Sequence, residues 1–503
     1  MRAFATGRIS PQWLAGNDDE REHIQNLRCC SRPFVWPGNS GFCRHVGEPV
    51  RDHVDLQRGS PLWAVRQRDY WVVGPVTITN ITPRDTRADG ITMHGSMLNP
   101  PAGIFGQQGF DSRLYLHSNG GVPYSDSLNV ARAFPFSVPA GSSLLSSASF
   151  DPDRPAGVND HYPYIKTVAI LTVLASAPAP GSFRPPYVGT NKTINPNWNV
   201  SKINYGKLNR VAPLSTTPAL STVLQYAVEP QIEFVLGWVG RYVHPADNYL
   251  PARYPGSSSP TYGQAIANTY GAMLLAANMN YTNEQKAPLV IRLIQIGIDI
   301  YGAAINAPAP ANGVLWTHGG GHNGGRKMPM LFAGVLLNDT SMIARANHAS
   351  YKIFQEDSQF FYVSAYDVSI FHTACCDRAV EQYTSSDIGM PEWGQNHIPE
   401  PQEDSRLWGA FYRNIASSST MPHVLAAKLM AVESLWNQPA IFDYFEQRYY
   451  PQAKAYAGSG NEMEVYVRDL WAAYQNAPPP SGAPVSAPSS SGLPEAPVNL
   501  RIQ

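Results

Sequence analysis

The stretch YTNEQKAPLVIRLIQIGIDIYGAAI, residues 281–305, carries the strongest helical pattern in the chain. Thr282, followed three residues later by Gln285, is a capping-box signature and predicts that a helix begins here. Four aliphatic residues at helical spacing share one face: Leu289, Leu293, Ile296 and Ile300. Most other positions are apolar as well, so we expect this helix to be buried on all sides.

Further segments with helical spacing of apolar residues surround this helix. They occur at residues 217–243, 261–279, 328–338, 340–355, 405–416 and 422–447. Long polar loops join them, and they follow a region of strand-like segments instead of alternating with it. The second half of the chain is therefore predicted to be all-α: a bundle, a solenoid or an α/α toroid.

A different pattern precedes the helices. Short segments rich in β-branched and aromatic residues are separated by proline and glycine turns. They occur at residues 70–82, 89–97, 110–118, 134–150 and 164–178. These segments predict a β-sandwich-like domain. The phrase GSFRPPYVGTNK (181–192) predicts an irregular connector on the surface, because its prolines remove hydrogen-bond donors. Since strands and helices are segregated, the predicted fold class is α+β multidomain.

A chain of 503 residues favours more than one domain, since single cores rarely exceed roughly 250–300 residues. We expect an irregular N-terminal segment (1–65), a β-rich domain (66–190), a helical, toroid-like catalytic domain (191–476) and a Pro/Ser-rich linker (477–503). The final residues, PEAPVNLRI, resemble the opening strand of a fibronectin type III module. That resemblance implies a modular protein.

The charge balance limits the class of partner. Lys and Arg number 37 against 38 Asp and Glu, which gives a formal net charge of −1. This balance argues against nucleic-acid or membrane-surface partners held by bulk electrostatics. No continuous apolar run approaches the roughly 20 residues of a membrane span. The N-terminal sequence lacks the apolar core of a signal peptide, so either the protein is not secreted by that route or the true start is missing.

The cysteines do not form a disulfide framework, because their number is odd and two pairs are adjacent. They are Cys29, Cys30, Cys43, Cys375 and Cys376. A metal site that combines the last two with His372 and His397 is disfavoured, because adjacent cysteines have poor geometry for one ion. No metal or other cofactor is expected.

The phrase WTHGGGHNGGRK (316–327) places five glycines between two apolar segments. A simple glycine-rich turn is one interpretation, but a helix–helix connection needs one C-cap glycine and not five. The phrase matches neither a helical zinc motif nor a phosphate-binding P-loop. Its backbone N–H groups and basic side chains instead predict a site for a carboxylate or sulfate. The candidate residues are His318, His322, Asn323, Arg326 and Lys327.

A polar stripe runs along the helix 281–305. Arg292, Gln295 and Asp299 stand at positions i, i+3 and i+7. One interpretation is an internal salt bridge or a contact with neighbouring loops. The other is a carboxylate aimed into a cleft beneath the glycine-rich loop.

A third cluster lies between residues 362 and 397. The phrases YVSAYDVSIFHTACCDRA and MPEWGQNHIPEP combine aromatic residues with Asp, His and Asn. Sugar-binding clefts use such combinations, since rings stack on pyranose faces while polar groups bond to hydroxyls. The candidates are Tyr366, Asp367, His372, Trp393, Asn396 and His397.

The layout of a β domain beside a helical domain, with its chemistry on glycine-rich and aromatic loops, resembles the α/α-toroid polysaccharide lyases and their glycosidase relatives. In those families the β-sandwich more often follows the toroid, whereas here it precedes it. The phrases GSFRPPY and GGGHNGGRKMPMLFAGVLL are also similar to those of uncharacterised bacterial proteins, which implies no activity. Together with the fibronectin-like end, the resemblance implies an extracellular or periplasmic enzyme with a polysaccharide substrate.

For a lyase, the resemblance implies β-elimination on a uronic-acid polymer, with Tyr or His as base and Asn, His or Arg neutralising the carboxylate. Here we expect His322 to be the base, Asn323 and Arg326 to neutralise, and Tyr366 to donate a proton to the leaving oxygen. The first alternative is a glycoside hydrolase with the carboxylate pair Asp299 and Asp367, supported by Glu392 or Asp111. The second is a non-catalytic carbohydrate-binding protein. The oligomeric state is not predicted.

Overall fold

The computed structural model describes residues 53–56, 62–66, 69–88, 90–104, 106–115, 121–150, 164–228, 230–237, 243–245, 263–308, 314–317, 319–373, 381–397, 400–406, 411–453 and 465–483. These ranges belong to one compact unit, Val50–Gln503. The fibronectin-like phrase, most of the predicted segment 1–65 and all five cysteines lie outside the described residues.

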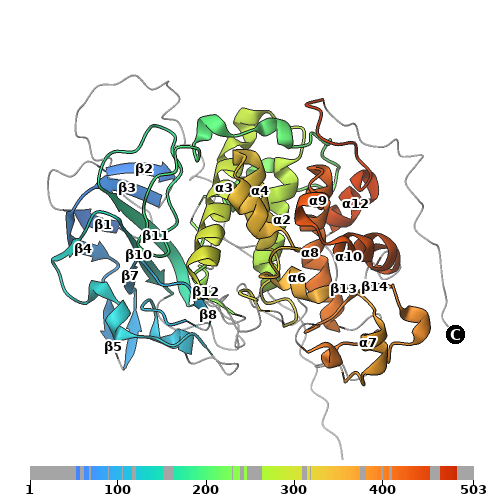
Figure 1. Cartoon of the computed structure of the whole chain (residues 1–503). Coiled ribbons are helices and arrows are strands. Elements are labelled where there is room, and N and C mark those ends of the chain that lie inside the picture. The colour runs from blue at the N-terminus through green and yellow to red at the C-terminus, as the bar shows by residue number, and fades with distance from the viewer. Residues whose placement is uncertain are drawn as a thin grey trace, which may run out of the picture. The chain divides into compact units, whose positions relative to one another are not determined.

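The protein is α+β, with a strand-rich region at residues 69–174 followed by a mostly helical region (Figure 1). One sheet has five strands in the order β2 (Leu62–Arg66), β3 (Asp69–Val73), β11 (Ile165–Leu174), β10 (Ser142–Ser149) and β7 (Ser96–Leu98). A second sheet has three strands in the order β1 (His53–Leu56), β4 (Val76–Thr82) and β9 (Phe136–Val138). Strands β3 and β11 are parallel, and the other pairs within these two sheets are antiparallel.

Smaller pairs complete the strand-rich region. They are β5 (Thr86–Ala88) with β6 (Ile91–Met93), and β8 (Gly103–Ile104) with β12 (Val235–Leu236). The second pair joins the strand-rich region to a segment that lies far along the chain.

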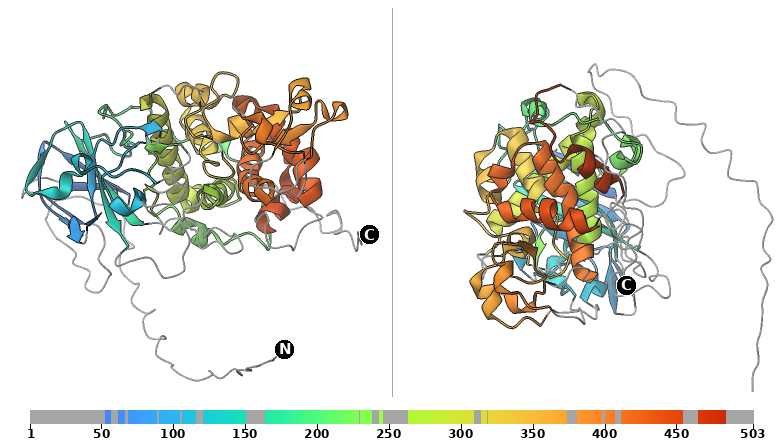
Figure 2. Two further views of the ribbon diagram at one scale, coloured as in Figure 1. Left: turned by 90° about the horizontal axis from the view of Figure 1, so that it is seen from below. Right: turned by 90° about the vertical axis from the view of Figure 1, so that its right-hand side faces the viewer.

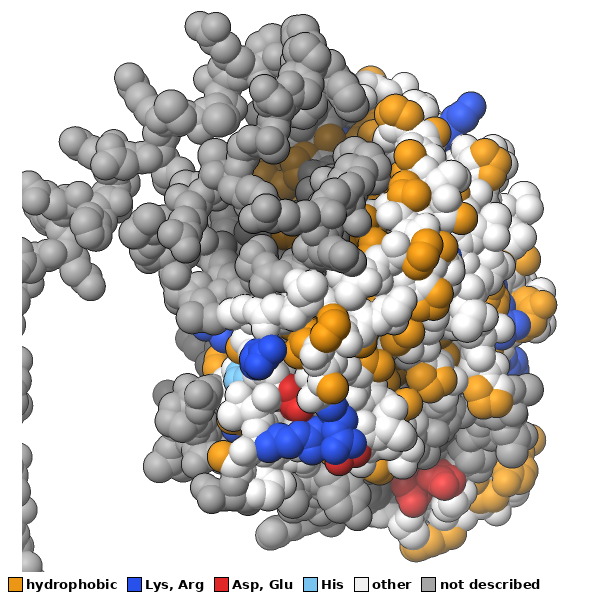
Figure 3. All heavy atoms as spheres, turned by 90° about the vertical axis from the view of Figure 1, so that its left-hand side faces the viewer, with side chains coloured by type: hydrophobic (Ala, Val, Ile, Leu, Met, Phe, Trp, Pro, Cys, Tyr) orange, Lys and Arg blue, Asp and Glu red, His pale blue; other side chains and the backbone are white. Residues whose placement is uncertain are grey.

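The face of the molecule in Figure 3 carries scattered apolar side chains and a few basic side chains close to acidic ones.

Four of the five predicted strand segments contain strands, but the segment 110–118 does not in its described part. Residues Ser112–Tyr115 form a short 3-10 helix instead. The Asp111 carboxylate accepts from the backbone N–H of Arg113 at 2.9 Å and pairs with its guanidinium at 2.7 Å. A side chain that binds its own backbone two residues ahead favours a turn over a strand.

The connector 181–192 is irregular, as its prolines predict, but its expected surface position was wrong. Phe183, Arg184 and Tyr187 are buried. The Arg184 guanidinium lies between Asp69 of β3, at 2.8 Å, and Asp299, at 2.7 Å. A buried arginine between two carboxylates fixes this segment between the sheet and the helices.

The helical region contains one long apolar helix, α3, and several shorter ones. The first four are α1 (Leu220–Gln225), α2 (Gly263–Ala277), α3 (Asn283–Asn306) and α4 (Lys327–Leu337). The next four are α5 (Thr340–Ala346), α6 (Gln355–Gln359), α7 (Ala365–Ser369) and α8 (Phe411–Leu429). The last four are α9 (Glu433–Trp436), α10 (Pro439–Asp443), α11 (Tyr450–Ala453) and α12 (Val465–Tyr474). A π-helical turn, Tyr444–Tyr449, connects α10 to α11.

Helix α3 has the capping box that the sequence predicts. Thr282 Oγ1 accepts from the N–H of Gln285 at 3.2 Å, and Gln285 Oε1 accepts from the N–H of Thr282 at 2.8 Å. The helix is long and apolar enough to span a membrane, but 83% of its most apolar window is buried inside the protein. It packs against α2 and α4, while α2 also packs against α8 (Figure 1). Helix α3 is thus a core helix of this unit.

A small segment, residues 360–406, carries its own apolar cluster. The strands β13 (Phe360–Tyr362) and β14 (Pro391–Trp393) pair within it, and α7 lies between them in sequence. Phe361, Val363 and Tyr383 form the buried cluster. The segment lies at the opposite end of the unit from the strand-rich region (Figures 1 and 2).

Candidate functional site

The glycine-rich loop has a fixed and unusual backbone. Gly319, Gly320 and Gly325 have φ values of 142°, 57° and 87°, which other residues adopt only with strain. A Cβ atom on Gly325 would lie 2.7 Å from the Cα of Ala267 in α2. Glycine is therefore required at this position both by conformation and by space.

Two glutamines of α6 hold the loop from one side. Gln355 and Gln359 both donate from Nε2 to the carbonyl oxygen of Gly320, at 3.0 and 2.9 Å. Gln355 also accepts from the N–H of Asn323 at 2.7 Å. All four residues are buried, so these bonds exchange poorly with water. The loop is a clamped structure and not a flexible turn.

The carboxyl groups that follow in α6 hold the end of the loop and the start of α4. Glu356 Oε1 accepts from the N–H of Gly325 at 2.7 Å, and Asp357 pairs with Lys327. Burial raises the pKa of Glu356 to about 7, helped by the charge of Asp357 and opposed by Lys327. Lys327 is fully buried, and it was predicted to contact substrate. Its ammonium group is instead neutralised by Asp357 within the protein.

Arg326 is also engaged inside the protein. Its Nε donates to Glu233 at 3.0 Å, and the same carboxylate lies 3.2 Å from His244 and 3.3 Å from the Trp316 indole nitrogen. Burial would raise the pKa of Glu233, but Arg326 and His244 lower it to about 2. The Arg326 guanidinium therefore anchors the loop inside the protein and is buried from solvent.

His322 and Asn396 both approach Gly319 of the loop. A Cβ built on Gly319 would lie 3.6 Å from His322 Cδ2 and 3.9 Å from Asn396 Oδ1. Both side chains are half-buried. Gln359 ties the two segments together, because its Nε2 also donates to the carbonyl oxygen of Gln395 at 2.7 Å. The structure therefore unites the glycine-rich loop with the third sequence cluster.

An aspartate–histidine pair lies next to Asn396. His397 Nδ1 is 2.9 Å from Asp404 Oδ2 and 3.9 Å from Asp367 Oδ1, and its ring stacks on Phe361 with the centroids 3.3 Å apart. Burial raises the pKa of Asp404, while the hydrogen bond to His397 opposes that shift. A carboxylate on one ring nitrogen fixes the tautomer and orientation of an imidazole. We call His322, Asn396, His397, Glu403 and Asp404 the loop site.

Glu403 joins this group through Asn396. Asn396 Nδ2 donates to Glu403 Oε2 at 2.6 Å, and the N–H of Asn396 lies 3.3 Å from Asp404 Oδ1. An amide has two N–H donors, so one is still available to a ligand. The backbone and side chain of Asn396 are thus oriented by two consecutive acidic residues.

The polar stripe of α3 lies elsewhere. Asp299 pairs with Arg184, and Arg292 lies 3.5 Å from Asp69 and donates to the carbonyl oxygen of Ala227 at 3.0 Å. Burial raises the pKa of Asp299 to about 6, although Arg184 opposes the shift. The internal salt bridge, one of the two interpretations of the stripe, is present. Asp299 lies beside the strand-rich region and Asp367 in α7 at the other end (Figure 1), so they do not form a catalytic pair.

The remaining predicted residues differ in exposure. Tyr366 is 62% exposed on α7, whereas Trp393 is buried in β14 and offers no ring face to a ligand. Asp367 forms the capping box of α7 with Ser364. His372 is buried, and its Nε2 lies 2.6 Å from the carbonyl oxygen of Asp367.

Some predicted residues lie outside the part of the chain that the structure describes, and others do not form the metal or carboxylate site considered from the sequence. His318 lies outside the described residues, as do Cys375 and Cys376. Among the described residues, no three His, Cys, Asp or Glu side chains are placed to hold a metal ion. Of the carboxylates that supported the hydrolase alternative, Glu392 pairs with two arginines and Asp111 with one.

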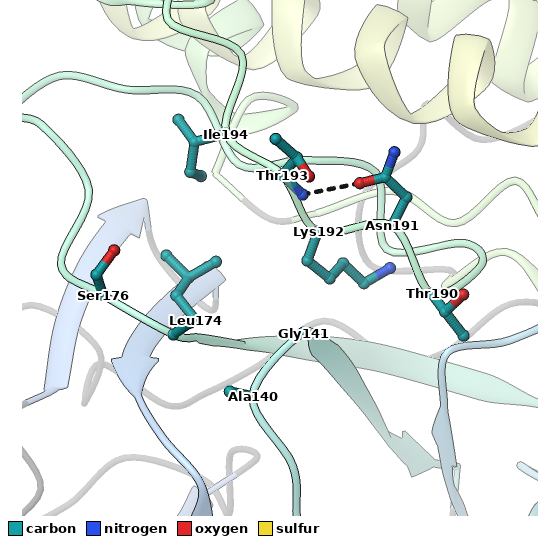
Figure 4. Close-up of a pocket in the computed structure, with 10 residues that line it drawn as sticks. Ala140, Gly141, Leu174, Ser176, Thr190, Asn191, Lys192, Thr193 and Ile194 are labelled. Carbon is teal, nitrogen blue, oxygen red and sulfur yellow. Dashed lines mark hydrogen bonds between the residues drawn. The ribbon is translucent and has the colours of Figure 1, made fainter.

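A separate hollow lies on the strand-rich region. It has a volume of about 460 Å³ and lies between the turn at Gly141 and the segment 190–194 (Figure 4). Lys192 lines it, but its ammonium group donates to the carbonyl oxygens of Pro186 and Gly189, at 2.8 and 2.7 Å. None of the residues predicted for a functional site lines this hollow.

Several residues of the loop site, or of the contacts that hold the glycine-rich loop, were not predicted from the sequence. Gln359, Glu403 and Asp404 have no periodic or motif signal, and Glu233 lies far from the loop in sequence. The one available signal was the density of acidic residues, because Glu403 and Asp404 lie within three residues of the end of the phrase MPEWGQNHIPEP, which itself contains Glu400. Comparisons of the chain with protein-family models, with curated proteins and with solved structures find no match.

Proposed function

We propose that this protein is a polysaccharide lyase that cleaves an anionic, uronic-acid-containing polysaccharide by β-elimination. The observation that supports this most is the approach of the His322 ring and the Asn396 amide to the same glycine, Gly319. In this proposal the half-buried imidazole is the base, and the second N–H of Asn396 Nδ2, beyond the one that donates to Glu403, is the hydrogen-bond donor for an anion. The clamped loop holds them in place without reorganisation.

The reaction needs one proton removed and one returned. His322 takes the proton from the carbon next to the substrate carboxylate. The electrons of that C–H bond form the new carbon–carbon double bond while the bond to the glycosidic oxygen breaks. The departing oxygen takes a proton from the hydroxyl group of Tyr366, which is exposed on α7.

The substrate carboxylate needs a donor as its negative charge spreads. We assign this role to Asn396, because Arg326 is engaged with Glu233 and Asn323 is buried, whereas Asn396 is half-buried. In this proposal, Asn323, Arg326 and Lys327 shape the loop and His397 contributes to substrate binding.

The proposal includes the finer architecture that the resemblance implies, a β-sandwich-like region beside an α/α-toroid-like one. The strand-rich region precedes the helical region, which is the less common order in those families. It also places the protein in the extracellular space or the periplasm, because a polymeric substrate does not cross membranes.

A glycoside hydrolase is the second candidate, and Glu403 favours it. This half-buried carboxyl group touches Asn396 in the loop site, and Asp367 lies near His397 in the same segment. Two carboxyl groups about 5–9.5 Å apart are what hydrolysis of a glycosidic bond requires.

Product analysis on alginate, polygalacturonate and hyaluronan distinguishes the candidates. Elimination leaves an unsaturated uronide that absorbs in the ultraviolet, whereas hydrolysis yields reducing ends without this absorbance. We expect both signals to rise together for one of these polymers. Reducing ends alone would replace the lyase by the hydrolase, and neither signal would reject both.

A further inference from the structure

Two aromatic side chains of the segment 360–406 are unusually exposed for large hydrophobic residues. Phe371 is 75% exposed and Tyr366 is 62% exposed, the highest values among the large hydrophobic residues that the structure describes as exposed. Tyr362 and Ile388 of the same segment are 39% and 51% exposed. Single exposed apolar residues are common on proteins, but a concentration in one short segment indicates a binding surface.

This segment is well anchored. Asp367 caps α7 by accepting from the N–H and Oγ of Ser364, at 2.7 and 2.6 Å. The Nε2 atom of His372 lies 2.6 Å from the carbonyl oxygen of Asp367, and Tyr383 packs edge-on against the His372 ring. Tyr366 and Phe371 therefore stand next to residues with fixed positions, and their exposure is not caused by a loose chain.

The two aromatic residues belong to a segment that contacts the loop site. Tyr366 directly precedes Asp367, whose carboxylate lies 3.9 Å from His397 Nδ1. Phe371 directly precedes His372, which contacts the backbone of the same aspartate. Each of the two rings is thus carried by a residue adjacent in sequence to a residue linked to the loop site.

We propose that Tyr366 and Phe371 form a stacking surface for sugar rings of the polysaccharide chain beside the loop site. The inference rests on the proposed action on a polysaccharide. Pyranose rings present C–H faces that stack on aromatic rings, and an extended chain gains one such contact per ring. The two rings add contacts to sugar units of the bound polymer, so loss of both rings weakens polymer binding.

The test uses the full chain and affinity gels that contain alginate, polygalacturonate or hyaluronan. The double variant Y366A/F371A removes both rings, and Y366F/F371Y keeps both rings. Tyr351→Ala is the matched control, because Tyr351 is also exposed, at 40%, but lies outside the segment 360–406. We expect retardation by the polymer to weaken roughly tenfold in Y366A/F371A and to stay unchanged in the other two variants.

The outcomes separate this inference from the lyase proposal. Retardation of Y366A/F371A equal to that of the wild type overturns the stacking surface, and the lyase proposal then stands on product analysis. A wild type that no polymer retards also overturns it. If Y366A/F371A changes a dimer into a monomer and leaves retardation unchanged, the surface belongs to self-association and the inference fails. Retardation by a polymer that is not cleaved, lost in Y366A/F371A, supports the stacking surface and contradicts the lyase.

Discussion

The Glu356 carboxyl group holds the glycine-rich loop and has a raised pKa. One of its oxygens binds the N–H of Gly325, and the other has no hydrogen-bond partner among the described residues. Its pKa of about 7 lies above the ordinary value of 4.5 because the group is buried. The folded protein therefore binds a proton here that the unfolded chain releases between pH 4.5 and 7.

This difference predicts a pH dependence of stability. Since the folded state holds the proton more tightly, the wild type loses stability as the pH rises from about 4.5 to about 7. Glu356→Gln keeps an acceptor for Gly325 and removes the charge. We therefore compare the free energy of unfolding of the variant with that of the wild type. This difference, variant minus wild type, should be about 3 kcal/mol larger at pH 8 than at pH 4.5. Urea unfolding at the two pH values measures it.

Glu284→Gln is the matched control at the start of α3. The pKa of Glu284 is lowered by a hydrogen bond to its own backbone and by Thr282, so the sign is opposite. Removing this carboxylate lowers stability at pH 8 relative to low pH. A constant difference between Glu356→Gln and the wild type at both pH values would contradict the assignment to Glu356.

At the scale of elements, Gln359 joins three of them. It ends α6, holds the carbonyl oxygen of Gly320 in the loop and holds that of Gln395 after β14. Gln359→Glu keeps the shape of the side chain, but an ionised carboxylate cannot donate to either carbonyl group. We expect a loss of about 2–4 kcal/mol in the free energy of unfolding, because a buried carboxylate would face two carbonyl oxygens to which it cannot donate, although Gly320 keeps its bond from Gln355.

Gln225→Ala is the control for this prediction. The Gln225 amide makes an exposed bond of 3.4 Å within α1, so its removal should change stability by less than about 0.5 kcal/mol. The two variants are compared by denaturant unfolding. If Gln359→Glu is as stable as Gln225→Ala, Gln359 does not clamp the loop.

At the scale of the whole molecule, buried charges join regions that are distant in sequence. Arg184 of the connector binds Asp69 in the sheet and Asp299 in α3, and Arg326 of the loop binds Glu233. Tyr187 links the two groups, because its hydroxyl contacts the backbone N–H of Glu233. These contacts fix the glycine-rich loop relative to the sheet.

The fold class follows from the sequence because its signals are local. The apolar pattern and capping box of residues 281–305 predict α3 closely, and the segregation of strands from helices predicts the α+β class. The errors have physical reasons. Asp111 turns its own backbone away from a strand, and Arg184 buries a proline-rich connector that looks like a surface loop.

The site was only partly predictable. The loop 316–327 and the cluster at 362–397 were both predicted from the sequence as separate features, because glycine content and aromatic density can be read from the sequence alone. Their contact through Gln359 was not, because it depends on tertiary packing. For the same reason Arg326 and Lys327 looked free to bind substrate, although Glu233 and Asp357 neutralise them.

The most direct test of the loop site compares His322→Ala with Lys352→Ala on the polymer that the wild type cleaves. Lys352 is exposed outside the site and serves as the control. The rate of appearance of unsaturated product is measured by ultraviolet absorbance, with denaturant unfolding of each variant alongside. We predict that His322→Ala loses roughly 100-fold or more of the rate with unchanged unfolding, while Lys352→Ala keeps the wild-type rate. A folded His322→Ala protein that cleaves at the wild-type rate would contradict the role of His322 as the base.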